Sequence, residues 1–161
     1  MLENLEKYQI VLASSSPRRK ELLQRLGLPF KVRTLLGIDE SYPEDMPAEK
    51  IAEHISRKKA EGYKKTLLDG ELIITADTIV SLGGKVYGKP RDVDEARRML
   101  QELSGHSHKV FSGVTVFTKE KMVSFTVESR VTFAALDAEE IDFYVDSYLP
   151  LDNAYPVLDA V

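Results

Sequence analysis

Three serines and two arginines are concentrated in the run Ser14-Ser15-Ser16-Pro17-Arg18-Arg19. Ser16 followed by Pro17 is typical of a helix N-cap with proline at the first helical position. The beginning of such a helix presents free N–H groups and the positive end of the helix dipole, which attract anions. The run therefore predicts a binding site for an anion with several oxygens, most simply a polyphosphate. A well-capped helix with exposed arginines is the alternative interpretation of this segment.

Three further polar residues occupy positions that structure alone does not require. Asp77 directly follows the apolar run 72–76, where a carboxylate is costly unless it is paired or liganded. Lys59 lies on the apolar stripe of an expected helix over about 48–62, so it either snorkels past the helix end or points into a cleft. Lys89 follows an expected hairpin. Taken singly, Asp77 could instead be held by backbone donors, and Lys89 could be an exposed turn residue.

These four cations and one buried acid suit the hydrolysis of a phosphoanhydride. The arginines and lysines would neutralise the charge of a triphosphate and of its transition state. The acid would activate water, directly or through a divalent metal. No glycine-lysine loop of the Walker type is present, which argues against a P-loop site. His54, His106 and His108 lack the spacing with carboxylates that a metal site needs.

The composition limits the classes of protein that the chain can belong to. Its 161 residues suit one domain, which we expect to span 1–161, and they contain no cysteine, so disulfides and thiol chemistry are excluded. A net charge of −4 disfavours a general nucleic-acid binder. The N-terminus has no signal-peptide pattern, and no apolar run reaches the roughly 18 residues that span a bilayer. We therefore expect a cytoplasmic protein that binds no membrane.

Alternating patterns along the chain predict the elements that would position these residues. Strands are expected at 8–13, 30–33, 72–76, 79–82, 85–87, 109–117 and 123–133. Helices are expected after the caps Ser16, Asp92 and Asp137 and over about 48–62, and a mobile acidic loop is expected at 36–47. Early alternation of strands and helices followed by long strands predicts an α/β protein with a mixed sheet.

Leu22, Leu23 and Leu26 supply an apolar face to the first helix, and the helix after Asp92 has the stripe Ala96, Met99, Leu100 and Leu103. Glu95 and Glu140 stand at the capping-box places after Asp92 and Asp137. Apart from Lys59, the basic stretches 57–59 and 64–65 are interpreted as mostly a solvated helix face.

Several short motifs, read together, resemble the Maf family of septum-formation-inhibitor-like nucleotide pyrophosphatases. The resemblance covers about residues 10–153. Each motif alone is weak, but their order and spacing are specific. The motifs are Leu12 to Arg19, Lys59-Ala60, Ala76 to Val80, Gly88 to Asp92, Leu103 to Val110, Ser112-Gly113-Val114 and Pro150 to Ala154.

The resemblance implies a nucleoside triphosphate pyrophosphatase that cleaves between the α and β phosphates. It also implies a central mixed sheet flanked by helices, two lobes around a nucleotide cleft as in inosine triphosphatases, a divalent cation (Mg²⁺ or Mn²⁺) and often a homodimer. Asp77 would be the general base, and Asp39 or Glu40 would join it near the metal or water. The residues implied to hold the phosphates are Ser14, Arg18, Arg19, Lys59 and Lys89.

Two positions bear on the substrate. Family members acting on dTTP and UTP resemble this chain at Arg18 and Thr78, whereas those acting on 7-methyl-GTP have tryptophan and glutamine there. The resemblance therefore implies a dTTP/UTP-type enzyme that removes modified nucleotides. A 7-methyl-GTP pyrophosphatase and a nucleotide-binding regulator without turnover are the alternatives.

The chain departs from the family near its C-terminus. Family members usually continue with Lys-Ala-Gly-Ala-Tyr-Gly-Ile-Gln-Gly, whereas this chain reads Asn153-Ala154-Tyr155-Pro156 and stops at Val161. The two glycines and the specificity-setting glutamine have no counterpart. We therefore expect the C-terminal part of the family domain to be incomplete in this sequence.

Overall fold

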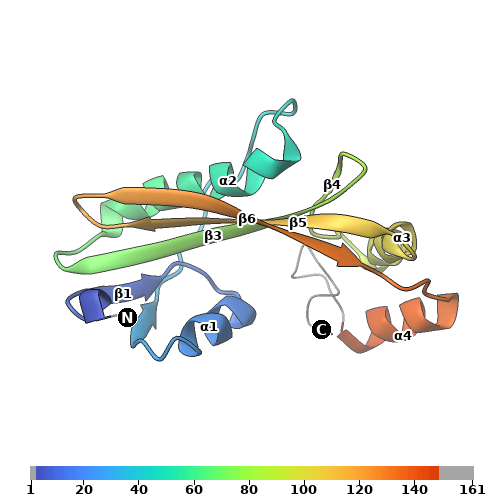
Figure 1. Cartoon of the computed structure of the whole chain (residues 1–161), viewed down its shortest axis with the longest axis horizontal. Coiled ribbons are helices and arrows are strands. Elements are labelled where there is room, and N and C mark those ends of the chain that lie inside the picture. Colours follow the sequence, from blue (N-terminus) through green and yellow to red (C-terminus); the bar gives the residue numbers. More distant parts are fainter. Residues whose placement is uncertain (1–2, 149–161) are drawn as a thin grey trace. The chain divides into compact units, whose positions relative to one another are not determined.

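The computed structural model describes residues 3–148 of the chain (Figure 1) and confirms the predicted α/β class with a mixed sheet. Its strands are β1 (Gln9–Leu12), β2 (Phe30–Val32), β3 (Glu71–Leu82), β4 (Lys85–Tyr87), β5 (Ser107–Phe117) and β6 (Met122–Thr132). Its helices are α1 (Pro17–Gln24), α2 (Ala48–Tyr63), α3 (Val93–Leu103) and α4 (Ala138–Tyr148), with single 3-10 turns at Glu3–Leu5 and Lys64–Thr66. The motif Pro150 to Ala154 lies outside the described residues.

The chain divides into two compact units. The first comprises Met1–Asp77 and Ser112–Val127, and the second comprises Thr78–Phe111 and Glu128–Val161. Strands β3, β5 and β6 therefore contribute residues to both units. None of the helices within residues 3–148 is long and apolar enough to cross a membrane.

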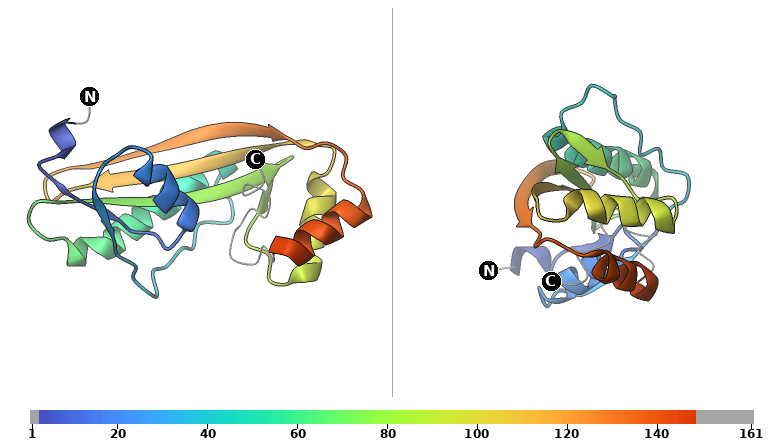
Figure 2. Two further views of the ribbon diagram at one scale, coloured as in Figure 1. Left: turned by 90° about the horizontal axis from the view of Figure 1, so that it is seen from below. Right: turned by 90° about the vertical axis from the view of Figure 1, so that its right-hand side faces the viewer.

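The first unit is built on parallel strands in the order β2-β1-β3, followed by β5 and β6. Ile10 at the centre of β1 stands opposite Phe30 on one side and Leu72 on the other. Parallel neighbours need crossover connections, which α1 and α2 supply, and the two helices lie on opposite sides of the strands (Figures 1 and 2). A buried core joins α2 to the sheet through Val11, Ala13, Ala60, Tyr63, Ile73 and Phe117.

The second unit holds the hairpin β3–β4 and the helices α3 and α4. Gly83 and Gly84 both have positive φ, which the tight turn between the two strands requires. Helix α3 buries its predicted stripe, and α3 and α4 lie side by side around Leu100 and Val145 (Figure 2). Arg97 on α3 also pairs with Asp142 and Asp146 on α4.

Local signals placed most elements correctly, with three differences. β3 runs without interruption through Asp77 and Thr78, where the sequence predicted a break. The predicted apolar face of α1 is not buried in the described structure. Leu22 on the helix and Leu26 just after it are each more than half exposed. The capping box at Asp137 forms with both of its hydrogen bonds, whereas the carboxylate of Glu95 binds Arg91 and not its own cap residue.

Candidate active site

The first unit brings a lysine and two carboxylates together. The Nζ atom of Lys59 on α2 lies 2.8 Å from Oδ1 of Asp77 on β3 and 3.3 Å from Oε1 of Glu40 in the loop before α2. The side chains of Lys59 and Asp77 are each only 13% exposed, whereas that of Glu40 is 55% exposed. Lys59 therefore does not snorkel into solvent but points inward to a desolvated acid, which was one of the two outcomes that its position predicted.

A second cation reaches the same point of β3 from the beginning of α1. Nη1 of Arg19 donates to the carbonyl oxygen of Ala76 over 3.0 Å, and Lys59 donates to that oxygen over 3.4 Å. The hydroxyl of Ser14 lies 3.4 Å from the same Nη1 atom. The carbonyl of Ala76 is thus the shared acceptor that orients both cations beside Asp77.

The local sequence explains why α1 presents its N-terminus there. Ser16 is the N-cap, and its hydroxyl accepts a hydrogen bond from the backbone N–H of Arg19. The hydroxyl of Ser14 accepts another from the N–H of Ser16, and Pro17 occupies the first helical position. Arg18, next to Pro17, is half-buried. The strand-to-helix junction therefore gathers hydroxyl groups and guanidinium groups as the sequence predicted.

Burial dominates the electrostatics of Asp77. Desolvation raises the pKa of its carboxyl above the ordinary value and outweighs the opposing effects of Lys59 and Arg19, while Glu40 raises it further. Burial likewise lowers the pKa of Arg19, against the charges of Asp77 and Glu40. Asp77 is therefore a stronger proton acceptor than an exposed aspartate, a property typical of functional acids.

The two acids of the loop before α2 have different partners. Glu40 reaches Lys59, whereas Asp39 accepts hydrogen bonds from Nζ of Lys58 at 2.5 Å and from the N–H of Ser41 at 2.8 Å. The bond from Lys58 is the main reason why the pKa of Asp39 lies below its usual range. Asp39 holds the loop against α2 in this structure, and its predicted role at a metal remains a prediction.

The donor set fits a divalent ion that is bound jointly with a substrate. Asp77 and Glu40 already flank one cationic group, the ammonium of Lys59. Magnesium commonly takes one or two protein carboxylates and completes its shell with phosphate oxygens and water. Within residues 3–148 no cluster of three or more potential metal ligands exists, so the protein alone does not supply a complete cage.

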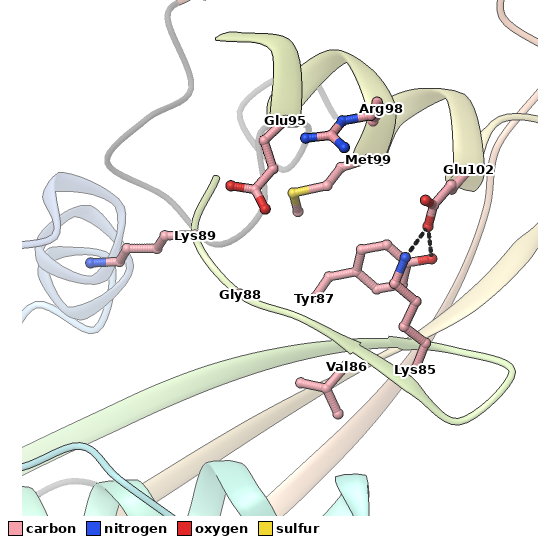
Figure 3. Close-up of a pocket in the computed structure, with 9 residues that line it drawn as sticks. All are labelled: Lys85, Val86, Tyr87, Gly88, Lys89, Glu95, Arg98, Met99 and Glu102. Carbon is pink, nitrogen blue, oxygen red and sulfur yellow. Dashed lines mark hydrogen bonds and ion pairs between the residues drawn. The ribbon is translucent and has the colours of Figure 1, made fainter. Parts of the chain in front are cut away.

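Lys89 and Thr78 belong to the second unit. Lys89 is exposed at the rim of a pocket of about 170 Å³ that also borders Tyr87, Arg98 and Glu102 (Figure 3). There the Tyr87 hydroxyl donates to Glu102 over 2.5 Å, and its pKa is raised to about 12 by burial and by that carboxylate. Thr78 is half-buried on β3, next to Asp77. The predicted phosphate-binding role of Lys89 and the specificity role of Thr78 are not tested by this geometry.

Sequence reasoning missed two components of this cluster. The carbonyl of Ala76 has no side-chain signal, because any residue at that position of a strand supplies the same oxygen. Lys58 was treated as part of a solvated basic face, although it holds Asp39. Its position next to Lys59, one helix residue away, could have suggested a contact with the neighbouring acid of the loop.

Known proteins share first the fold of this chain and then its family. The fold resembles the solved structure of the Staphylococcus aureus Ham1 protein, with a TM-score of 0.55 and 14% identity over 76% of this chain and 70% of that one. The family model described as "Maf-like protein" matches residues 9–155. The chain therefore belongs to the Maf-like protein family, as its motifs predicted.

Curated relatives agree with the predicted subfamily. A protein named dTTP/UTP pyrophosphatase from Bacteroides thetaiotaomicron is 56% identical over 154 residues, which cover 96% of this chain and 80% of the relative. A protein of the same name from Phocaeicola vulgatus is 54% identical over the same shares of the two chains. The chain thus spans about four-fifths of the length of these relatives.

Proposed function

We propose that this chain is a nucleoside triphosphate pyrophosphatase that converts dTTP, UTP or related modified pyrimidine nucleotides to the monophosphate and pyrophosphate. The observation that carries this proposal is the desolvated carboxylate of Asp77, which pairs with Lys59 and follows the carbonyl that Arg19 binds. The choice of pyrimidine nucleotide follows from Arg18 and Thr78 and from the names of the relatives.

Binding of the triphosphate relies on the cations beside β3. Lys59 carries three N–H donors and directs them to Asp77, Glu40 and the carbonyl of Ala76, so an arriving phosphate competes with Glu40, the more exposed of its two acidic partners. Arg19 and the hydroxyl of Ser14 offer further donors, and the first turn of α1 adds backbone N–H groups. Arg18 and Lys89 complete the proposed set of phosphate-binding residues.

Asp77 acts as the general base. A water oxygen forms a bond to the α-phosphorus while Asp77 accepts its proton, and the bond from that phosphorus to the α–β bridging oxygen breaks. The electron pair leaves with the pyrophosphate, whose charge Lys59 and Arg19 stabilise. The raised pKa of Asp77 suits this step, because it makes the carboxylate a better proton acceptor.

Asp77 and Glu40 would hold a divalent cation, magnesium or manganese, together with phosphate oxygens of the substrate. When bound, the cation supplies charge neutralisation at the phosphate oxygens and polarises the attacked phosphorus. Asp39 keeps the loop of Glu40 in place through Lys58.

We further propose a cytoplasmic homodimer whose single domain binds neither membrane nor nucleic acid.

The proposal is tested by measuring pyrophosphate release from dTTP, UTP, 7-methyl-GTP and ATP with magnesium or manganese. Release from dTTP and UTP, lost in Asp77→Asn but kept in the matched variant Asp69→Asn, is the expected result. Asp69 suits the control because it is an exposed acid that pairs only with the surface Lys119 in the described structure. Faster pyrophosphate release from 7-methyl-GTP would replace the proposed pyrimidine substrate with that nucleotide. Nucleotide binding without pyrophosphate release would favour the regulatory alternative.

A further inference from the structure

The motif Ser112-Gly113-Val114 has no role in the chemistry above, yet its glycine lies directly against the backbone of α2. A Cβ atom added at Gly113 would fall 2.1 Å from the carbonyl carbon of Ala52 and 2.3 Å from the N atom of Glu53. The backbone of α2 therefore rests directly on β5 at this glycine. Any side chain there would push the helix away from the strand.

One turn further along α2, buried hydroxyl groups tie the helix to three strands. Thr75 on β3 donates to the carbonyl of Ser56 over 2.7 Å. The hydroxyl of Ser56 lies 2.8 Å from that of Thr115 on β5, which lies 2.8 Å from that of Ser124 on β6. Ser56, Thr75 and Thr115 are fully buried, so these polar groups have no water to replace a lost partner.

The hydroxyl chain has a defined direction. Ser56 donates its single proton to the carbonyl of Glu53 over 2.8 Å, so it must accept from Thr115. Thr115 then has no proton left for Ser124 and accepts from it. Each hydroxyl in this chain has one proton to donate, so all of its hydrogen bonds form together at only one placement of α2 on the strands.

These contacts lie next to the ion pair of the active site on both elements. Lys59 follows Ser56 by three residues, about 4.5 Å along the same side of the helix. Asp77 follows Thr75 by two residues on the same face of β3, about 6.6 Å away. The Thr75–Ser56 hydrogen bond and the Asp77–Lys59 ion pair are therefore successive links between α2 and β3.

We propose that Gly113, Thr75 and the hydroxyl chain of Ser56, Thr115 and Ser124 are positioning residues that fix the placement of α2 and so hold Lys59 on Asp77. This inference rests on the proposed function for its catalytic consequence. The glycine sets how near the helix lies to the sheet, and the hydroxyl chain sets its register along the strands. A shift of about 1 Å at a reacting centre is enough to lower a rate markedly.

The test compares two substitutions at one buried position. Thr75→Val keeps the shape of threonine but loses the hydroxyl, whereas Thr75→Ser keeps the hydroxyl. We expect Thr75→Val to lower kcat at saturating dTTP about tenfold or more, per folded molecule, and Thr75→Ser to restore most of it. Gly113→Ala should have the same effect where it folds. Thr132→Val is the control for the substitution itself, because it makes the same change on β6 in the second unit, where the hydroxyl forms an exposed pair with Ser107.

Crystal structures of the Thr75 variants supply a readout that does not depend on turnover. The Lys59–Asp77 distance, 2.8 Å in this structure, should open beyond about 4 Å in Thr75→Val and stay closed in Thr75→Ser. Unchanged kcat in folded Thr75→Val, or an ion pair that stays closed in it, would overturn the inference. Absence of turnover in the unsubstituted chain would overturn the proposed function alone, and the ion-pair distances would still decide the positioning role.

Discussion

Two carboxylates on β3, the buried Glu71 and the half-buried Asp77, each pair with a cation, yet their pKa values shift in opposite directions. Glu71 accepts two hydrogen bonds from the guanidinium of Arg33, at 2.5 and 2.9 Å, and a third from the N–H of Leu68 at 3.0 Å. These bonds hold the pKa of Glu71 below its ordinary value. Asp77 accepts one bond from Lys59 in the described structure, and desolvation leaves its pKa raised.

The difference separates a structural ion pair from a functional one. Nη1 of Arg33 also donates to the carbonyl of Thr66, so the pair joins the residue after β2 to β3 and to the 3-10 turn before β3. The lysine beside Asp77 divides its donors between two acids and one carbonyl. A carboxylate that accepts three hydrogen bonds stabilises the fold. A carboxylate that accepts one keeps oxygen lone pairs available to bind a ligand or to accept a proton.

The largest contrast is expected from removing the two charges. Asp77→Asn should lower kcat about a thousandfold, since general bases contribute on this scale, and leave the melting temperature nearly unchanged. Glu71→Gln should do the reverse and lower the melting temperature while kcat per folded molecule is kept. Calorimetry and pyrophosphate release on both variants would check this, and equal losses of stability would contradict the contrast.

The structural pair can also be broken from its cation. Arg33→Met leaves Glu71 buried without its main partner and should lower the free energy of unfolding by about 2–3 kcal/mol. Arg33→Lys should recover only part of this, because an ammonium cannot bind both carboxylate oxygens as a planar guanidinium does. Urea unfolding at neutral pH measures both values. Full recovery by lysine would show that the two-fold bond to Glu71 is unimportant.

The two acids should give opposite dependences of stability on pH. Because the pKa of Glu71 is lowered in the folded state, its contribution is present above about pH 4.5, the ordinary pKa of glutamate, and is lost as the pH falls through the folded-state pKa. Because the pKa of Asp77 is raised, protonation of Asp77 favours the folded state. Urea unfolding from pH 7 to 3 should therefore show a shallower acid loss for Glu71→Gln and a steeper one for Asp77→Asn than for the unsubstituted protein.

The smallest effect is expected from the exposed pair that holds the loop of Glu40. Lys58→Met frees Asp39 and should lower kcat/KM for dTTP about two- to fivefold, the scale of a surface ion pair. Lys64→Met is the matched control, since it breaks an exposed pair with Glu61 that includes no residue of the loop. Equal losses in the two variants would show that Lys58 acts only as a surface charge.

Most of the fold could be predicted because its signals are local. The cap at Ser16, the box at Asp137 and the two positive-φ glycines of the β3–β4 turn each depend on residues a few positions apart. The errors came from long-range contacts. β3 continues through Asp77 because Lys59, 18 residues earlier in the chain, pairs with the carboxylate that seemed to interrupt the strand.

The sequence alone determined the family, the elements and the types of residue in the site, because motif order, hydrophobic period and capping are written in neighbouring residues. Only the tertiary structure decided that Glu40 and not Asp39 reaches Lys59, that the carbonyl of Ala76 orients two cations, and that Gly113 brings α2 onto β5. Each of these depends on where separate segments meet in space. Burial of Asp77, and with it the raised pKa, exists only once α1, α2 and the loop before α2 surround the strand.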